Sequence, residues 1–270
     1  QKKFYKHYID KNTLSKKIKK NKICIDLSNY IYDFKKYILN TLYEKKLITS
    51  KKINLEDIHR YTNLKSKKEK SKNDMTRNEL TAAFFEKDKF FFDLYFSAIK
   101  EISKKLDFKF IFQKDPFLRF NLPTKSKIDG LLPHVDLGLG HPPGEINIWL
   151  PLTKTYKNNS LSISDFEKSF NFFKQYDFNF RKYGELYDLK IRKKALKILK
   201  PYVAQAGKAL IFDGRIMHKS ILNNSNKTRV SLDFRILPTN LEKRASFYKG
   251  TGYKKQKFKR AHYYYKSSIW

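Results

Sequence analysis

The sequence has 270 residues, of which 40% are apolar, which is enough for one substantial hydrophobic core. Lysine and arginine number 59 against 26 aspartate and glutamate residues, giving a formal net charge of +33. This charge predicts a strong positive field and favours acidic partners. The aromatic content of 16% excludes an intrinsically disordered chain.

The cysteine content and the hydropathy pattern bear on the compartment. Cys24 is the single cysteine, so an internal disulfide is excluded and a reducing compartment fits. No run approaches the roughly 18 apolar residues that a membrane span requires. The first thirty positions also lack the apolar segment of a signal peptide. We therefore expect a cytoplasmic protein without a membrane span.

Residues 1–108 are predicted to form a helical N-terminal support region. Apolar residues recur there at spacings of three and four, which is typical of amphipathic helices. They are Ile31, Phe34, Ile38 and Leu42, followed by Phe84, Phe85, Leu94, Ile99 and Ile102. A lysine-rich segment, 64–74, separates the two stretches and is predicted to be a solvated loop.

Residues 109–240 are predicted to form a β-rich core, because short aromatic and β-branched runs replace the helical period. The predicted strands are FKFIF from about 109, FLRFNL at 117–122, EINIWL at 145–150, KALIF at 208–212 and TRVSLDFRI at 228–236. A helical insert at about 165–202, with its helix near 185–202 closed by Pro201, interrupts them. Residues 241–270 form a basic aromatic tail, and we expect all three parts to make one integrated domain.

The predicted strands alternate between polar and apolar positions, and residues two apart share a face. In the last strand Arg229, Ser231, Asp233 and Arg235 oppose Val230, Leu232, Phe234 and Ile236. Similar alternation occurs at 118–122 and 145–150. For any single strand, a sheet with its polar face in water explains the pattern equally well. Together the strands favour an α+β fold in which a sheet curls around a polar cavity and helices cover its outside, as in an open barrel or jelly roll.

A candidate metal site comes from His134, Asp136 and His218. His134 and Asp136 are two apart, so they share a face of an extended segment, and His218 completes a facial triad of two histidines and one carboxylate. His141 is the competing ligand and is interpreted as a loop or substrate-side residue. No lysine or arginine occurs from 128 to 153, where about six would be expected at the frequency of the whole chain. This gap favours a cation site, because nearby positive side chains would repel the metal. A histidine two positions before an aspartate is, however, also common by chance.

Arg229 and Ser231 are candidates for binding a carboxylate. A buried guanidinium paired with a hydroxyl forms a fork that holds a carboxylate, and Arg229 follows His218 by eleven positions. With this pair the sequence resembles the Fe(II)/2-oxoglutarate-dependent dioxygenases. The blocks DPFLRFNLP, HVDLGLGHPPGEINIWLPLT, GKALIFDGRIMHKSILNN and TRVSLDFRILP resemble in particular the phytanoyl-CoA hydroxylase-like branch and its streptomycin-biosynthesis StrG-like members.

The resemblance implies a double-stranded β-helix, a cupin-like barrel with the helical N-terminal region outside the sheet, that uses Fe(II), 2-oxoglutarate and O2. It implies hydroxylation of an unactivated C–H bond and assigns the metal to the triad and the far carboxylate of 2-oxoglutarate to Arg229 and Ser231. Asn147, Trp149 and Arg119 are candidate cofactor contacts, with a packed core as the alternative for Asn147 and Trp149. For Arg119 the alternative is an ion pair with Asp233 or Glu145.

The substrate that we expect is a small polar molecule or a glycan, sugar-like or anionic. Nucleic acid is the first alternative, because Tyr263, Tyr264 and Tyr265 in the lysine-rich tail resemble a surface on which bases stack. Against it, the chain carries no recognisable nucleic-acid-binding motif. A zinc hydrolase or a binding shell with the same three ligands is the second alternative, but it gives Arg229 and Ser231 no role.

Overall fold

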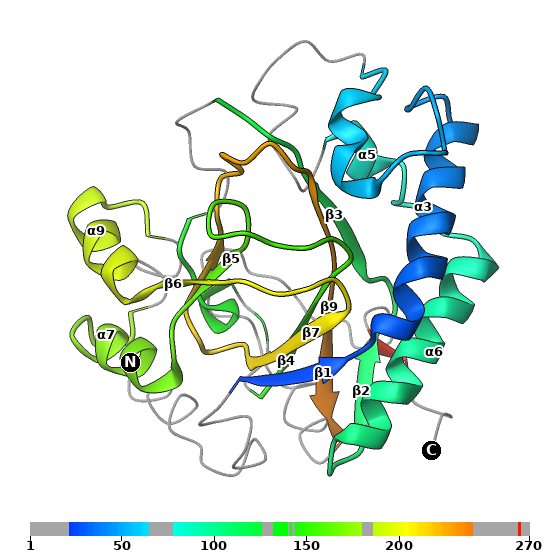
Figure 1. Ribbon diagram of the computed structural model, residues 1–270. Coiled ribbons are helices and arrows are strands. Elements are labelled where there is room, and N and C mark those ends of the chain that lie inside the picture. The colour runs from blue at the N-terminus through cyan, green and yellow to red at the C-terminus, as the bar shows by residue number, and fades with distance from the viewer. Residues whose placement is uncertain are drawn as a thin grey trace.

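In the computed structural model the described residues are 22–64, 78–125, 132–139, 141, 144–179, 186–239 and 264–265, and they form a mixed α/β structure with two antiparallel sheets (Figure 1). The helices are α3 (Ile31–Glu44), α5 (Glu79–Ala82), α6 (Lys89–Lys105), α7 (Phe166–Lys174) and α9 (Leu189–Ile198), with 3₁₀ turns η2 (Ser28–Tyr30), η3 (Leu55–Arg60) and η4 (Asp136–Leu139). None of the helices in these ranges is long and apolar enough to cross a membrane.

The larger sheet has the order β1-β7-β4-β9-β2-β10, and β3 also pairs with β9. Its strands are β1 (Ile23–Asp26), β2 (Phe110–Gln113), β3 (Phe117–Asn121), β4 (Ile146–Pro151), β7 (Lys208–Asp213), β9 (Arg229–Pro238) and β10 (Tyr264–Tyr265). The smaller sheet has the order β6-β5-β8, formed by β5 (Leu161–Ile163), β6 (Lys200–Tyr202) and β8 (His218–Ser220).

The apolar face of the larger sheet packs against α3 and α6, which lie side by side along it (Figure 1). Ile148 of β4 and Phe234 of β9 are buried in this core. The two helices meet through an edge-on contact of Phe34 and Phe91, whose ring centroids are 6.1 Å apart. Asp88 caps α6 by accepting a hydrogen bond from the Phe91 amide at 2.9 Å. The predicted helical support outside the sheet is therefore confirmed for these residues.

The opposite face of the larger sheet looks toward the smaller sheet. Trp149, Leu210 and Phe212 of β4 and β7 share a small apolar cluster with Leu161 and Ile163 of β5. The odd-numbered residues of β9 from 229 to 235 lie on this inner side, because their even-numbered neighbours belong to the helix-covered core. The alternation in the sequence thus predicted the two faces correctly.

The helices α7 and α9 lie beside the smaller sheet and pack over the segment that carries His134 (Figure 1). Phe173 and Ala195 from these helices contact the cluster that contains Val135 and Met217. Asp165 and Asp188 cap the two helices by accepting amide hydrogen bonds at 2.8 and 3.0 Å. These helices therefore support the chain on either side of the histidines.

Two elements differ from the sequence prediction. Ile23–Asp26, in the region predicted to be helical, forms β1 and pairs with β7, since tertiary pairing decides the conformation of so short a segment. The helix predicted at 185–202 ends at Ile198, and Pro201 lies in β6 instead of closing the helix. β6 is an edge of the smaller sheet, where a residue without an amide hydrogen is tolerated.

The C-terminal tail contributes one described element. Tyr264 and Tyr265 form β10, whose backbone pairs with Gln113 and Phe112 of β2. The other tail residues, Tyr263 among them, and nearly all of the lysine-rich loop at 64–74 lie outside the described residues.

Candidate metal and cofactor site

His134 and His218 are held side by side by a backbone bridge. The amide of each donates a hydrogen bond to the carbonyl of the other, at 3.1 and 2.9 Å. The imidazole centroids are 4.5 Å apart. A pairing across 84 positions therefore brings together two side chains that the sequence could associate only by residue type.

Asp136 completes the triad. Its Oδ1 lies 3.7 Å from His134 Nε2 and 3.5 Å from His218 Nε2. The residue is 1% exposed, and Oδ1 has no hydrogen-bond partner in the described part of the chain. Buried carboxylate oxygens are rarely left unsatisfied, so this atom requires a ligand. The three atoms can hold one metal ion.

The tautomers of both histidines suit a metal. His134 Nδ1 lies 2.8 Å from the Leu132 carbonyl oxygen, and His218 Nδ1 lies 2.9 Å from that of Ile216. A carbonyl oxygen only accepts, so each Nδ1 carries a proton, and Nε2, which points toward Asp136, is the ring nitrogen left for a metal. Burial, followed by the proximity of His134, lowers the pKa of His218 to about 4. Its imidazole is thus neutral at neutral pH, as a metal ligand must be.

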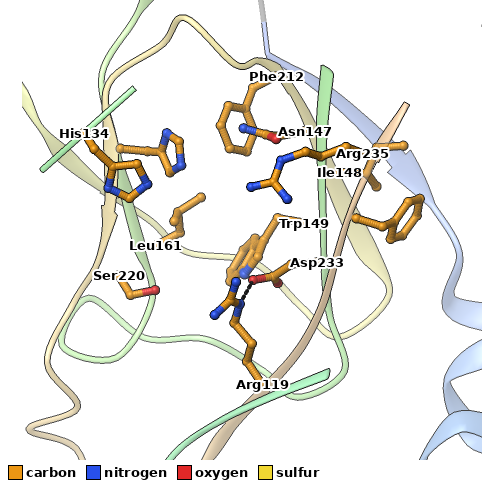
Figure 2. A pocket seen from close by; sticks show the side chains of 12 residues that line it. Arg119, His134, Asn147, Ile148, Trp149, Leu161, Phe212, Ser220, Asp233 and Arg235 are labelled. Carbon is orange, nitrogen blue, oxygen red and sulfur yellow. Dashed lines mark hydrogen bonds and ion pairs between the residues drawn. The ribbon is translucent and has the colours of Figure 1, made fainter. Parts of the chain in front are cut away.

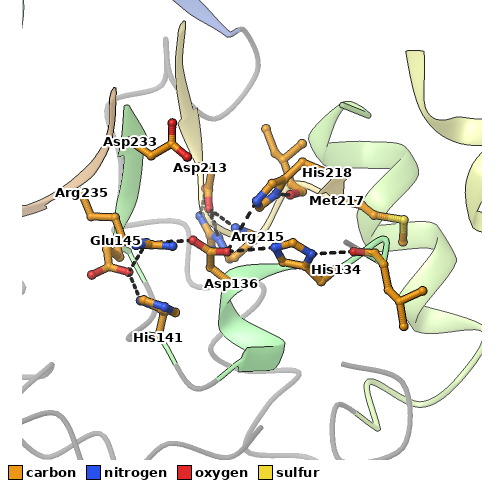
Figure 3. A network of polar contacts seen from close by, with 12 residues as sticks. His134, Asp136, His141, Glu145, Asp213, Arg215, Met217, His218, Asp233 and Arg235 are labelled. Carbon is orange, nitrogen blue, oxygen red and sulfur yellow. Dashed lines mark hydrogen bonds and ion pairs between the residues drawn. The ribbon is translucent and has the colours of Figure 1, made fainter. Parts of the chain in front are cut away.

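Arg235 lies on the other side of Asp136. Its Nε donates a hydrogen bond to Asp136 Oδ2 at 2.9 Å and is 3.5 Å from Glu145 Oε2 (Figure 3). Burial disfavours the charged form of Asp136. Its pKa is nevertheless held well below the usual range, first by the Arg235 cation and then by the neighbouring histidines. The Asp136 carboxylate is therefore ionised.

A cavity of about 80 Å³ lies between the sheets, next to the two histidines (Figure 2). Its lining residues come from both sheets: Arg119, His134, Asn147, Ile148, Trp149, Leu161, Phe212, His218, Ser220, Asp233, Phe234 and Arg235. His134 lies at one end and the ion pair of Arg119 and Asp233 at the other (Figure 2). A small ligand bound to a metal at the first end would extend toward these charged groups.

Arg229 lies fully buried behind the wall of the cavity. Its Nη2 is 3.4 Å from Ser220 Oγ, and its guanidinium lies 5.8 Å from the Trp149 ring. Burial lowers the pKa of Arg229 to about 10, with Asp233 opposing this shift and Arg119 adding to it. The group thus remains a cation at neutral pH, and it contacts Ser220 and Trp149, which line the cavity.

Ser231 and Arg119 both contact Asp233. The Ser231 hydroxyl donates to Asp233 Oδ1 at 2.9 Å, and Arg119 Nε donates to Asp233 Oδ2 at 2.5 Å. The ion pair foreseen as the alternative for Arg119 is therefore present. Arg229 and Ser231 are both fully buried on the inner face; Arg229 contacts the Ser220 hydroxyl, and the Ser231 hydroxyl donates to Asp233.

Asn147 and Trp149 both line the cavity and are 7% and 4% exposed. Asn147 Nδ2 is buried without a hydrogen-bond partner among the described residues, so it can donate to a ligand. Trp149 forms a wall beside Ser220 and Arg119 (Figure 2).

Asp213 has a structural role. It accepts two side-chain contacts from Arg215 Nε, at 2.9 and 3.1 Å, and one from Nη2 at 2.6 Å, which fixes the turn before His218. The sequence reasoning missed the roles of Glu145 and His141, whose Oε2 and Nδ1 are 2.6 Å apart beside Arg235. The absence of basic residues from 128 to 153 already marked this segment, but not its pairing with β9.

Comparison with known proteins places these residues in context. Over 127 residues, which are 47% of this chain and 46% of the relative, the sequence is 30% identical to the streptomycin biosynthesis protein StrG of Streptomyces griseus. The chain is similar to StrG. The predicted resemblance is thereby confirmed, and the match spans about half the length of that relative. No family model matches the chain.

Solved structures were compared as well. One similar structure is the non-heme α-ketoglutarate-dependent carbocyclase SnoK from nogalamycin biosynthesis, with a TM-score of 0.49, 12% identity and coverage of 83% of this chain and 84% of SnoK. Another is HygX from Streptomyces hygroscopicus with nickel and 2-oxoglutarate bound, with a TM-score of 0.47, 12% identity and coverage of 84% and 88%.

Proposed function

We propose that the protein is an Fe(II)- and 2-oxoglutarate-dependent oxygenase that hydroxylates an unactivated C–H bond of a small polar molecule. The observation that carries this proposal is the convergence of two imidazole Nε2 atoms on one buried carboxylate oxygen, with distances of 3.7 and 3.5 Å. Two histidines and one carboxylate are the ligand set of non-heme Fe(II) oxygenases and leave three positions open.

The donor set fits Fe(II) in its details. Asp136 Oδ1 is buried without a partner among the described residues, and both Nδ1 atoms lie against carbonyl oxygens that fix the ring orientations. In this assignment His134, Asp136 and His218 hold the metal. When bound, Fe(II) would activate O2, with 2-oxoglutarate oxidised to succinate and CO2, and this chemistry would supply the oxidant for the C–H bond. The protein positions the substrate and excludes water.

The charges around the cavity fit a dication bound together with a dianion. Within the described ranges, three arginines and three carboxylates line the cavity or contact its lining side chains, so their formal charges sum to zero. They are Arg119, Arg229, Arg235, Asp136, Glu145 and Asp233. A divalent metal adds two positive charges, and 2-oxoglutarate adds two negative ones. Each should therefore bind more tightly in the presence of the other.

We assign the far carboxylate of 2-oxoglutarate to Arg229, with Ser231, Asn147, Trp149 and Arg119 as further contacts. Arg229 is a buried cation that contacts Ser220 and Trp149 of the cavity wall. Asn147 offers a buried donor without a partner among the described residues. The Ser231 hydroxyl and Arg119 both donate hydrogen bonds to Asp233, so these two groups reach the cofactor only if the hydrogen bonds to Asp233 break.

The proposed fold of the catalytic core is a double-stranded β-helix over 109–240, with a helical insert at about 165–202. Two antiparallel sheets that face each other across the cavity support it. Residues 1–108 would be the helical support and 241–270 a basic tail, all in one integrated domain. A cytoplasmic location also remains a prediction.

For the substrate we propose a sugar-like or anionic metabolite or glycoconjugate. The support is the similarity to StrG, whose name assigns it to streptomycin biosynthesis, and the polar lining of the cavity. The net charge of +33 favours an acidic group on the substrate. No described feature of the site favours nucleic acid.

The test is a spectroscopic and product assay. Anaerobic protein with Fe(II) and 2-oxoglutarate should show the weak visible charge-transfer band of a chelated 2-oxo acid, and admission of O2 should release succinate slowly. His134→Ala and His218→Ala should abolish both signals. Tight Zn binding with neither signal would instead support a hydrolase or a binding shell.

A further inference from the structure

Asp136 is held from behind by a buried network of charged side chains. Arg235 Nε lies 2.9 Å from Asp136 Oδ2 and 3.5 Å from Glu145 Oε2, and the Glu145 oxygen lies 2.6 Å from His141 Nδ1 (Figure 3). The side chains of Asp136 and Glu145 are each 1% exposed. Two buried carboxylates this close repel each other unless a cation separates them, and Arg235 is that cation.

The backbone holds the same residues in register. The Asp136 amide donates to the Gly214 carbonyl at 2.8 Å, and the Gly214 amide donates to the Glu145 carbonyl at 3.1 Å. A Cβ atom at Gly214 would lie 3.1 Å from the Glu145 oxygen and 3.5 Å from Asp136 Cβ. The turn before His218 therefore fixes the positions of both carboxylate residues.

The two oxygens of Asp136 have different surroundings. Arg235 occupies Oδ2, whereas Oδ1 faces the two Nε2 atoms and has no described hydrogen-bond partner. A guanidinium on one carboxylate oxygen competes with a metal for that oxygen and so favours metal binding through the other oxygen. If both oxygens bound, the carboxylate would take a coordination position that the 2-oxo acid and O2 require.

Glu145 balances the charge of Arg235. A lone guanidinium next to a divalent metal would weaken metal binding by repulsion. With Glu145 beside it, Arg235 can orient Asp136 without adding net charge to the site. His141 contacts the same Glu145 oxygen, which limits the positions that Glu145 can adopt.

We propose that Arg235 and Glu145 are positioning residues that keep Asp136 a one-oxygen ligand and so preserve an open coordination position. This inference rests on the proposed function, because it presumes a metal on the triad. Arg235 acts on Asp136 directly, and Glu145 acts through Arg235. His141 belongs to this network rather than to the metal's ligands.

The experiment measures Co(II) binding, by calorimetry and by the visible absorption of the bound ion, in wild type, Arg235→Gln, Arg235→Lys, Glu145→Gln and the Arg235→Gln/Glu145→Gln double variant. Loss of a residue that orients a metal ligand typically costs about 10-fold to 100-fold in metal affinity. We expect that loss in Arg235→Gln, with a changed Co(II) spectrum, and a smaller loss in Glu145→Gln. The double variant should bind no more weakly than Arg235→Gln alone.

Lys227→Gln is the control, because this substitution also removes an ion-paired positive charge, but the partner of Lys227 is Asp57 at 2.8 Å and not a triad residue. Its Co(II) affinity and spectrum should equal those of wild type. Circular dichroism checks the fold of each variant, and the near-isosteric Glu145→Gln keeps the test decisive if Arg235→Gln does not fold.

The outcomes separate this inference from the proposed function. Tighter Co(II) binding by Arg235→Gln would mean that Arg235 acts only as a repelling charge, and an unchanged affinity and spectrum would mean that it does not position Asp136. Either result overturns the inference. A wild-type protein that binds no Co(II), or binds it equally well after His134→Ala, overturns the metal site itself.

Discussion

Replacing Arg229 with alanine tests the cofactor end of the cavity. Arg229 is fully buried, so its removal would leave a buried carboxylate without its cation. Such a loss costs about 3 to 5 kcal/mol, which corresponds to about two to four orders of magnitude in affinity. Arg119 cannot compensate, because it is already paired with Asp233 at 2.5 Å, and the Asp233 charge would then repel the ligand.

The assay is a titration of the Co(II)-loaded protein with 2-oxoglutarate under anaerobic conditions, followed by the visible spectrum and by calorimetry. The affinity of Arg229→Ala for Co(II) should match that of wild type, because Arg229 does not contact the triad. Arg229→Lys should recover part of the affinity for 2-oxoglutarate, since it retains the charge but not the fork. An unchanged affinity for 2-oxoglutarate in Arg229→Ala, together with a large loss of affinity in Arg119→Ala, would show that we assigned the carboxylate to the wrong arginine.

Three further predictions concern other contacts. Asp233→Asn should tighten 2-oxoglutarate binding at least about tenfold, because it removes a like charge and releases Arg119; weaker binding in the same titration would show that Asp233 supports the site. Gly214→Ala should weaken Co(II) binding, because its Cβ would lie 3.1 Å from the Glu145 carbonyl oxygen and displace the turn; an unchanged calorimetric affinity would contradict this. Burial and then Arg60 lower the pKa of His59 from 6.5, so the folded state binds its proton less readily than the unfolded state and stability falls as the pH drops below about 6.5. In urea unfolding, the free energy of unfolding of His59→Gln should fall less over that pH range than that of wild type. The same pH dependence in both proteins would refute this role of His59.

The sequence predicted the inner and outer faces of the sheet because a strand has a period of two. The alternation in β9 separated Arg229 and Arg235 from Val230 and Phe234, and the structure keeps that separation. The proposed metal ligands come from a different signal, since residue type and the gap in basic residues both marked His134 and Asp136.

The partners of individual charges were not predictable. Three arginines and three carboxylates surround the cavity in the described ranges, and the sequence does not say which pairs form. The pairing depends on strand register: β4 and β9 place Asn147 opposite Arg235 and Trp149 opposite Asp233. The short strand β1 was missed for a similar reason, because its pairing with β7 is nonlocal.

The most direct test of the account is the visible spectrum of the anaerobic protein with Fe(II) and 2-oxoglutarate. The account predicts a weak charge-transfer band that requires both components, disappears in His134→Ala and His218→Ala, and decays with release of succinate when O2 is admitted. A wild-type protein that binds Fe(II) but gives neither the band nor succinate at saturating 2-oxoglutarate would contradict it.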